Sequence, residues 1–237
     1  MTAAALAAGI ISSQAQGTVY SQNVVGYVNL SVPAAGSVMI ANQLDTGSNT
    51  LDNVFQGTGL VSLKTTILQW TGTGYNTYTY ENCSDSGGDQ GWYNTAGAEI
   101  GQTTYLQPGQ GVFMHNGSGS AITVPTVGQV TQGTNLYTIA SGTYIYSLPE
   151  PLAGTSLDST NVNLPAVSLK TTYLAWTGTG YNTLTYENCS DSGGDPGWYS
   201  TAGVNEDSTA AAWPNAGTSF FIHSPSAVTW TNVFEVQ

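Results

Sequence analysis

One long stretch of this chain occurs twice, and that duplication constrains the fold more than any other feature. The stretch from Val61 to Gly97 recurs from Val167 to Gly203, an offset of 106 residues. The copies differ at only five positions, which are Ile67/Tyr173, Gln69/Ala175, Tyr78/Leu184, Gln90/Pro196 and Asn94/Ser200. A period this long indicates two copies of one structural module.

The repeat extends beyond the near-identical block. The same offset aligns Asn29-Leu30 with Asn135-Leu136, and a two-residue slip aligns Phe113-Met114-His115 with Phe221-Ile222-His223. The sequence therefore predicts a β domain over residues 17–127 and a second over residues 128–237, each long enough to bury a core. Residues 127–130 offer no flexible linker, so we expect the domains to be closely coupled.

Composition favours an all-β fold. The chain has 29 Gly, 14 Tyr and 6 Trp but only 7% charged residues. Aromatic and β-branched residues suit strands, and abundant glycine suits the turns between them. We predict two tandem antiparallel β-sandwich-like domains.

The local patterns place the elements of the first domain. Strands are expected over residues 19–32, 37–44, 61–70, 75–81, 112–115 and 121–127. The Thr71–Gly74 turn joins a hairpin in which glycine would take positive φ. Leu51–Phe55, preceded by Ser48-Asn49-Thr50, is the one stretch expected to form a helical turn with an N-cap.

Charge and hydropathy limit the partners and the location. The net charge is −12, with two lysines and no arginine, so nucleic acid is excluded as a partner and an anionic membrane surface is disfavoured. Residues 1–16 resemble the apolar part of a secretory signal and are too short to span a bilayer. The expected location is extracellular or the cell surface.

The two cysteines, Cys83 and Cys189, lie at equivalent places in the repeat. A disulfide requires Cα atoms within about 7 Å, so domains that lie side by side would permit this bridge. Domains stacked end to end would leave both thiols free or bonded to a neighbouring molecule.

Each cysteine belongs to a polar, glycine-rich loop with dense carboxylates. The candidate ligands for a metal, with Ca²⁺ as the candidate cation, are Glu81, Asp85 and Asp89 and their copies Glu187, Asp191 and Asp195. The spacing is not that of an EF-hand. The alternative is that each stretch is a solvated hairpin loop that binds no metal. No other cofactor is expected.

Aromatic residues beside these loops suggest a second kind of site. Trp92, Tyr93, Trp198 and Tyr199 are candidates for stacking against a sugar, and Trp70, Tyr75, Trp176 and Tyr181 belong to the same aromatic set. The alternative is core and cross-strand packing. His115 and His223 are expected to be structural. Lys64 and Lys170 are expected on strand faces, where an isopeptide bond to an asparagine is an alternative to a salt bridge.

Several motifs together carry a family resemblance. They are GTVYSQNVVGYVNLSVPAAGS, SNTLDNVF, WTGTGYNTYTYE, LQPGQGVFMHN and FFIHSPSAVTWTNVFEVQ. In these the chain resembles secreted β-repeat proteins of the Verrucomicrobia type. The resemblance implies secretion and a β domain, and it implies no activity and no catalytic residues.

The N-terminus supplies the functional hypothesis. Residues 17–24 stand where the last strand of a preceding repeat would end. An unpaired strand there can add to the sheet of another molecule, and the alternative is that it extends the sheet edge of its own domain. The candidate assembly residues are Thr18, Val19, Tyr20 and Val24. We expect a non-enzymatic secreted structural protein that assembles by strand addition into a fibre or surface layer. The alternative is a carbohydrate-binding module, assisted by calcium.

Overall fold

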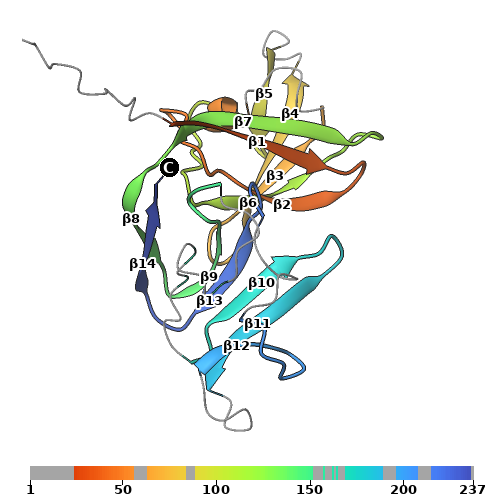
Figure 1. Ribbon diagram of the computed structural model, residues 1–237. Coiled ribbons are helices and arrows are strands. Elements are labelled where there is room, and N and C mark those ends of the chain that lie inside the picture. The colour runs from red at the N-terminus through yellow and green to blue at the C-terminus, as the bar shows by residue number, and fades with distance from the viewer. Residues whose placement is uncertain are drawn as a thin grey trace, which may run out of the picture.

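A computed structural model describes residues 24–55, 63–83, 89–151, 157, 162, 164, 169–188, 196–207 and 215–235. In these residues the chain is almost wholly β, with one short helix. The strands form two similar pairs of antiparallel sheets, which confirms the predicted all-β class with two sandwich-like parts (Figure 1). We call residues 24–130 unit 1 and residues 133–235 unit 2.

Unit 1 contains a five-stranded sheet and a two-stranded ribbon. Its elements are β1 (Val24–Val32), β2 (Ser37–Ala41), α1 (Leu51–Val54), β3 (Thr66–Trp70), β4 (Tyr75–Cys83), β5 (Asp89–Asn94), β6 (Gly111–His115) and β7 (Ile122–Val130). The sheet has the order β2-β6-β3-β4-β5, and β1 pairs with β7 along its whole length, from Val24 opposite Val130 to Val32 opposite Ile122.

Unit 2 repeats this plan. Its strands are β8 (Gly133–Ile139), β9 (Gly142–Tyr146), β10 (Thr172–Trp176), β11 (Tyr181–Asn188), β12 (Pro196–Ser200), β13 (Phe220–Ser224) and β14 (Val228–Phe234). The five-stranded sheet has the order β9-β13-β10-β11-β12, and β8 pairs with β14 to make the second ribbon. Each strand thus has a counterpart in unit 1 in the same sheet position.

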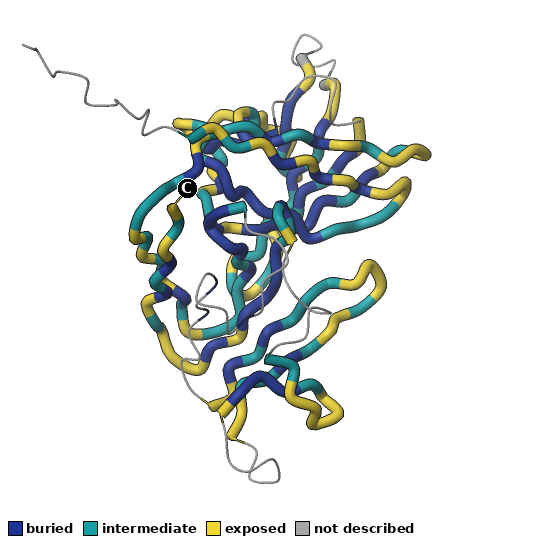
Figure 2. The backbone as a smooth tube through the Cα atoms, in the orientation of Figure 1, coloured by how far each residue is buried: buried dark blue, intermediate teal, exposed yellow. Residues whose placement is uncertain are grey.

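Each ribbon covers one face of its own five-stranded sheet. In β1 exposed and buried residues alternate, and Val28, Leu30 and Val32 point inward to the core of unit 1. A strand with side chains on alternate faces can bury one face while the other meets solvent. Trp92 fills that core, and Trp198 with Trp230 fills the core of unit 2. Figure 2 shows buried positions along the strands and exposed positions mainly at the turns.

The expected hairpin turns are present in both copies. Gly72 has φ +97° and Gly178 has φ +99°, so the first glycine of each turn takes the left-handed conformation that glycine tolerates best. The backbone N–H of Thr71 donates to the carbonyl of Gly74 at 2.9 Å, and Thr177 does the same to Gly180 at 2.9 Å. The two turns therefore have the same geometry.

Several predicted bounds were wrong. The strand expected from Val61 begins only at Thr66, because Lys64 and Thr65 together face Tyr80 in a β-bulge. Lys64 has φ +71° and Lys170 φ +80°, and both lysines are exposed, so neither lies on a regular strand face. The predicted helical turn is present as α1, but its N-cap residue Thr50 makes no side-chain capping bond.

Two further differences concern the ends of strands. β7 runs on to Val130, so it crosses the domain boundary expected after residue 127, and β8 begins at Gly133. β5 begins at Asp89, within what the sequence suggested was loop, since residues 89–94 pair with β4.

Candidate functional site

The four aromatic residues expected to stack on sugars do not reach solvent. Trp92 is 0% exposed, and Tyr93, Trp198 and Tyr199 are also buried. Trp92 packs edge-on against Tyr80, as Trp198 does against Tyr186, so these rings have core roles. This part of the sugar-site prediction is corrected, because stacking requires an exposed ring face.

The acidic loops fall largely outside the described residues. Asp85, Asp191, Asp195 and Cys189 lie outside them, and the side chains of Asp89 and Cys83 are likewise not described. Glu81 and Glu187 are exposed on the strands leading into the loops. Among the residues that the structure describes, no three His, Cys, Asp or Glu side chains gather as metal ligands would. The calcium and disulfide assignments remain predictions.

The predicted assembly strand also lies mostly outside the described ranges. Thr18, Val19 and Tyr20 precede them, whereas Val24 is the first residue of β1 and pairs with Val130 of the same molecule. Val24 therefore belongs to a ribbon within unit 1.

The two units meet through the faces of their five-stranded sheets. We call this contact the seam. Its core contains Met39, Phe113, Ile145 and Phe221, flanked by Leu68, Trp70, Leu174 and Trp176. Since unit 1 contributes Met39, Phe113, Leu68 and Trp70 and unit 2 contributes their counterparts, equivalent surfaces face each other. This is the isologous arrangement of a two-fold dimer, here within one chain.

Hydrogen bonds cross the seam in equivalent pairs. The indole N–H of Trp70 donates to the carbonyl of Thr143 at 2.6 Å. The indole N–H of Trp176 donates to the carbonyl of Ser37 at 3.0 Å, and Ser37 is the counterpart of Thr143. Each partly buried indole thus finds its acceptor in the other unit, which fixes how the sheets are aligned.

The backbone also bridges the units at the outer edges of β2 and β9. Ala41 N–H donates to Gly217 carbonyl at 2.9 Å, and its counterpart Ser147 donates to Gly109 carbonyl at 2.9 Å. Isolated antiparallel bridges join Ile40 to Thr218 and Tyr146 to Gln110. The edge strands of both sheets therefore continue their pairing into the other unit.

His115 and His223, which the sequence predicts to be structural, make hydrogen bonds beside the seam. The Ser37 hydroxyl lies 3.0 Å from His115 Nδ1, and the Thr143 hydroxyl lies 2.9 Å from His223 Nδ1. Ser37–His115 and Thr143–His223 are cross-strand partners in their sheets. Because serine in one copy is threonine in the other with the same bond, these contacts fit the structural role expected for both histidines.

An exposed aromatic pair lies at the rim of the seam. Tyr75 is 43% exposed and Tyr181 is 40% exposed. Each ring packs edge-on against a tryptophan of its own unit, Tyr75 on Trp70 at 4.8 Å and Tyr181 on Trp176 at 5.0 Å between ring centroids. Partial burial raises the pKa of both hydroxyls, and the charge of Tyr75 raises the pKa of Tyr181 further.

The seam is symmetric in its centre and asymmetric at its ends. Gln43 is buried, and its amide donates to the carbonyls of Leu148 at 2.9 Å and Glu150 at 3.0 Å and accepts from Gly217 N–H at 2.6 Å. All three partners belong to unit 2. The counterpart of Gln43 is Pro149, which has no side-chain amide and cannot make these bonds. Only unit 1 therefore contributes this set of side-chain hydrogen bonds, which we call the Gln43 clamp.

A second asymmetry is a buried carboxyl group in unit 2. Glu150 is 0% exposed, and one of its oxygens accepts from Asn135 at 2.9 Å, while the other has no hydrogen-bond partner among the described residues. Burial raises the pKa of Glu150 to about 7, an effect that the Asn135 bond opposes. The counterpart of Glu150 is Leu44, a core residue of unit 1, so the charge is particular to unit 2.

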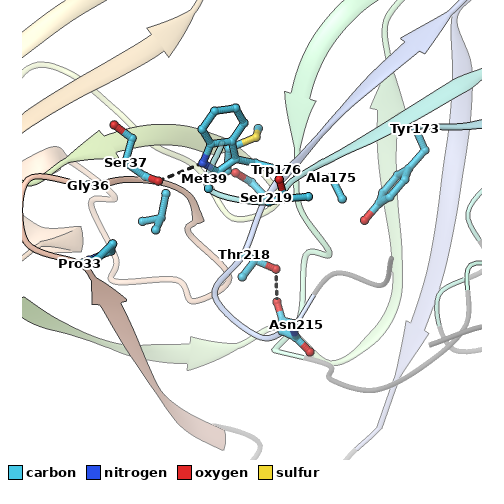
Figure 3. A pocket seen from close by; sticks show the side chains of 13 residues that line it. Pro33, Gly36, Ser37, Met39, Tyr173, Ala175, Trp176, Asn215, Thr218 and Ser219 are labelled. Carbon is cyan, nitrogen blue, oxygen red and sulfur yellow. Dashed lines mark hydrogen bonds between the residues drawn. The ribbon is translucent and has the colours of Figure 1, made fainter. Parts of the chain in front are cut away.

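The asymmetric end near β2 contains a cavity of about 440 Å³ (Figure 3). Unit 1 contributes Pro33, Gly36, Ser37, Val38 and Met39, and unit 2 contributes Tyr173, Ala175, Trp176, Thr177, Gly178, Asn215, Thr218 and Ser219. Sequence reasoning did not find this cavity, since residues far apart in the chain form it only when the sheets pack.

The ribbon β1–β7 is the other surface of note. Apart from a bridge between Asp45 and Gln129 at the end of β7, the two strands pair only with each other among the described residues. β1 carries two of the most exposed large hydrophobic residues, Val25 at 68% and Tyr27 at 62%. An exposed edge with apolar side chains invites pairing with another chain.

The edges of the five-stranded sheets differ from this ribbon. Residues 98–100 return along β5, where Ile100 N–H donates to Trp92 carbonyl at 2.8 Å, and Glu206 does the same to Trp198 at the edge of β12 at 2.8 Å. β2 and β9 bond across the seam. The two-stranded ribbons are thus better templates for a strand from another molecule than the five-stranded sheets. Of the two ribbons, β8–β14 also exposes hydrophobic residues, Leu136 at 68% and Val233 at 53%.

The fold and the seam define a duplicated all-β protein whose units join through equivalent sheet faces. No protein-family model matches the chain, and no curated protein matches it. In the part of the chain that the structure describes, no helix has the length and apolar character needed to cross a membrane.

Proposed function

We propose that this protein is a non-enzymatic, secreted structural subunit that assembles with copies of itself by strand addition. The observation that carries the proposal is the β1–β7 ribbon, with its exposed Val25 and Tyr27 and its lack of a third described strand. The segment before Val24, with its strand-like Thr18-Val19-Tyr20, is the proposed donor strand to a neighbouring ribbon.

The test compares assembly of the wild type with that of a charged ribbon. Val25→Lys with Tyr27→Lys places two ammonium groups on the exposed face, a device that natural edge strands use against pairing. Electron microscopy and light scattering over a concentration series should show ordered assemblies for the wild type and monomers for the double variant. Leu169→Lys, which changes another exposed hydrophobic residue in the same way, is the control and should still assemble.

Two results separate failure of folding from failure of the proposal. The double variant must keep the circular dichroism and melting temperature of the wild type, as expected for substitutions at exposed positions. A wild type that stays monomeric at every concentration, with residues 1–23 present or removed, rules out the assembly.

A carbohydrate-binding module is the second candidate, and the exposed pair Tyr75 and Tyr181 favours it. Two neighbouring rings at the rim of the seam, each about two-fifths exposed, offer the stacking surface that Trp92 and Trp198 do not. Calcium would act through the acidic loops, beyond the described residues. Binding in a glycan array that Tyr75→Ala and Tyr181→Ala each abolish would support this candidate, and no glycan binding by the wild type would eliminate it.

A further inference from the structure

The cavity at the seam has an occupied counterpart in the same molecule. Gly72 and Gly178 are equivalent turn glycines with the same φ. A Cβ placed on Gly72 would meet the Tyr144 ring, with the hydroxyl at 2.9 Å and two ring carbons at 3.1 Å. A Cβ placed on Gly178 would meet no atom of the described residues within 4 Å. The turn in unit 1 is therefore covered by a phenol ring, and the turn in unit 2 is open.

The residue that accounts for this difference is Val38. Val38 is the counterpart of Tyr144, since the two are 106 residues apart at the same place in β2 and β9. Tyr144 reaches across the seam from unit 2 to the turn of unit 1. Val38 lines the cavity on the reciprocal side but is too short to cover Gly178. The molecule thus lacks one ring where symmetry would place it.

Some of the differences between the two copies of the near-identical stretch lie at this cavity. Two of the five differing positions, Tyr173 and Ala175, line the cavity, and they replace Ile67 and Gln69. The Gln69 amide accepts a hydrogen bond from Tyr78 at 3.2 Å, and alanine in its place removes a long polar side chain. The change to Ala175 and the change to Val38 both enlarge the space beside Gly178.

The wall of the cavity has the character of a binding site. Met39, Val38, Ala175 and Trp176 supply apolar surface, and a volume of about 440 Å³ is within the range of ligand pockets. Ser219 also lines the cavity and is 5% exposed, but its hydroxyl is buried against Gly111 and does not face the cavity. In Figure 3 Thr218 and Asn215 lie below Trp176 and Met39, and the Thr218 hydroxyl donates to the Asn215 carbonyl at 2.7 Å.

We propose that this cavity binds the phenol ring of a tyrosine side chain presented by a partner polypeptide. The bound ring covers the Gly178 turn as Tyr144 covers the Gly72 turn, with Val38, Ala175 and Trp176 around it. The occupant is a tyrosine because the molecule itself places a tyrosine, carried on a strand, at the equivalent position. This site is separate from the β1–β7 ribbon and does not depend on the proposed assembly.

The two seam indoles provide a readout with an internal control. The N–H of Trp176 bonds to Ser37 in the cavity wall, whereas the N–H of Trp70 makes the same bond where Tyr144 already fills the space. With N-acetyl-L-tyrosinamide as the probe, NMR should show a saturable shift of the Trp176 indole resonance and none of the Trp70 resonance. Trp→Phe variants assign the two signals.

Substitution of Val38 tests the reason for the opening. Val38→Tyr restores the missing ring and should abolish the shift, whereas Val25→Tyr, the same change on the exposed face of β1, should leave it unchanged. If Val38→Tyr does not fold, Ala175→Gln installs the residue of the other copy and gives the same test. Both variants must show native indole dispersion before binding is compared.

Three results would overturn the proposal. The first is no saturable shift at Trp176 in the wild type. The second is an equal response to N-acetyl-L-leucinamide, which has no ring. The third is a nuclear Overhauser contact in the free protein between the Trp176 indole and another aromatic ring of its own chain in the cavity, because the space would then have an internal occupant.

Discussion

Phe113 and Phe221 occupy equivalent positions in the two units and pack on each other, with ring centroids 6.1 Å apart. Two equivalent residues can touch only where they lie beside the axis that relates their units. Each ring also meets the tryptophan of the opposite unit, Phe113 with Trp176 at 5.5 Å and Phe221 with Trp70 at 6.2 Å. At the centre of the seam, the two phenylalanines therefore pack against each other and against the tryptophans of both units.

Phe113→Ala and Phe221→Ala should destabilise the protein by similar amounts. Truncating a buried phenylalanine costs about 3–5 kcal/mol, and both rings are 7% exposed in equivalent surroundings. Denaturant unfolding followed by tryptophan fluorescence measures both. The transition should remain single, because the seam couples the units. Two separated transitions in the wild type would contradict this coupling.

Gln43→Leu should lower the free energy of unfolding by about 2–4 kcal/mol. The substitution removes three hydrogen bonds to unit 2 and leaves the buried Gly217 N–H without its acceptor, and an unsatisfied buried group costs about 1–3 kcal/mol. Thermal unfolding measured by calorimetry gives the change. Gln102→Leu, at an exposed position, is the control and should shift the midpoint little.

Glu150 should make the protein less stable as pH rises from about 4.5 to about 7. Its pKa in the folded state is about 7, above the ordinary value of 4.5, so the folded state binds more protons than the unfolded state in this window. Stability is highest below the window, falls through it and levels off above it, with a total loss of roughly 3 kcal/mol.

Glu150→Gln should remove most of this slope and raise stability at pH 8. Urea unfolding at a series of pH values provides the measurement, and Glu235→Gln, at an exposed carboxylate, should keep the wild-type slope. Asp52 leaves a smaller residual slope of the same sign, because burial and the nearby Glu99 raise its pKa as well. An unchanged slope in Glu150→Gln would show that this carboxyl is not the cause.

Tyr75→Phe should lower the pKa of the Tyr181 hydroxyl toward its ordinary value. Burial is the larger cause of the raised pKa and remains in the variant, while the repulsion from ionised Tyr75 is lost. NMR titration of tyrosine labelled at Cζ resolves the two hydroxyls. A Tyr181 pKa that does not move would contradict an electrostatic interaction between the two hydroxyls.

The two cysteines should not bridge to each other within one molecule. β4 ends at Cys83, and β11 ends one residue before Cys189, at opposite ends of the molecule in Figure 1. A disulfide requires Cα atoms within about 7 Å. Purified monomer should therefore react with two equivalents of a thiol reagent. A monomer with no reactive thiols and a mass lower by two hydrogens would contradict this prediction.

The sequence was sufficient to predict the duplication and most strands, because local alternation and turn residues determine them, but it missed β5 in the glycine-rich stretch. The seam also left a signal in the sequence. The strands GVFMH and FFIHS are apolar without alternation, which is typical of strands buried on both faces. The sequence did not show which segments pack against each face of these strands, since that depends on the packing of distant parts of the chain.

The site residues were harder to predict for a physical reason. Trp92 and Tyr75 belong to the same repeated stretch, yet one is buried beside Phe55 and the other is exposed at the rim. Aromatic composition suits a core and a binding surface equally well. The cavity depends on Val38 standing opposite Gly178, a pairing that no spacing in the chain encodes.

An isologous contact inside one chain is what remains when the two copies of a homodimer become covalently fused. In a homodimer every substitution appears on both sides of the axis, so a pocket at its edge comes in pairs or not at all. Fusion removes that restriction. Gln43 could become a one-sided clamp, Glu150 could enter one core, and one turn could be uncovered while its twin stayed shielded. The duplication thus gave the molecule symmetry for stability and freedom for a single specialised face.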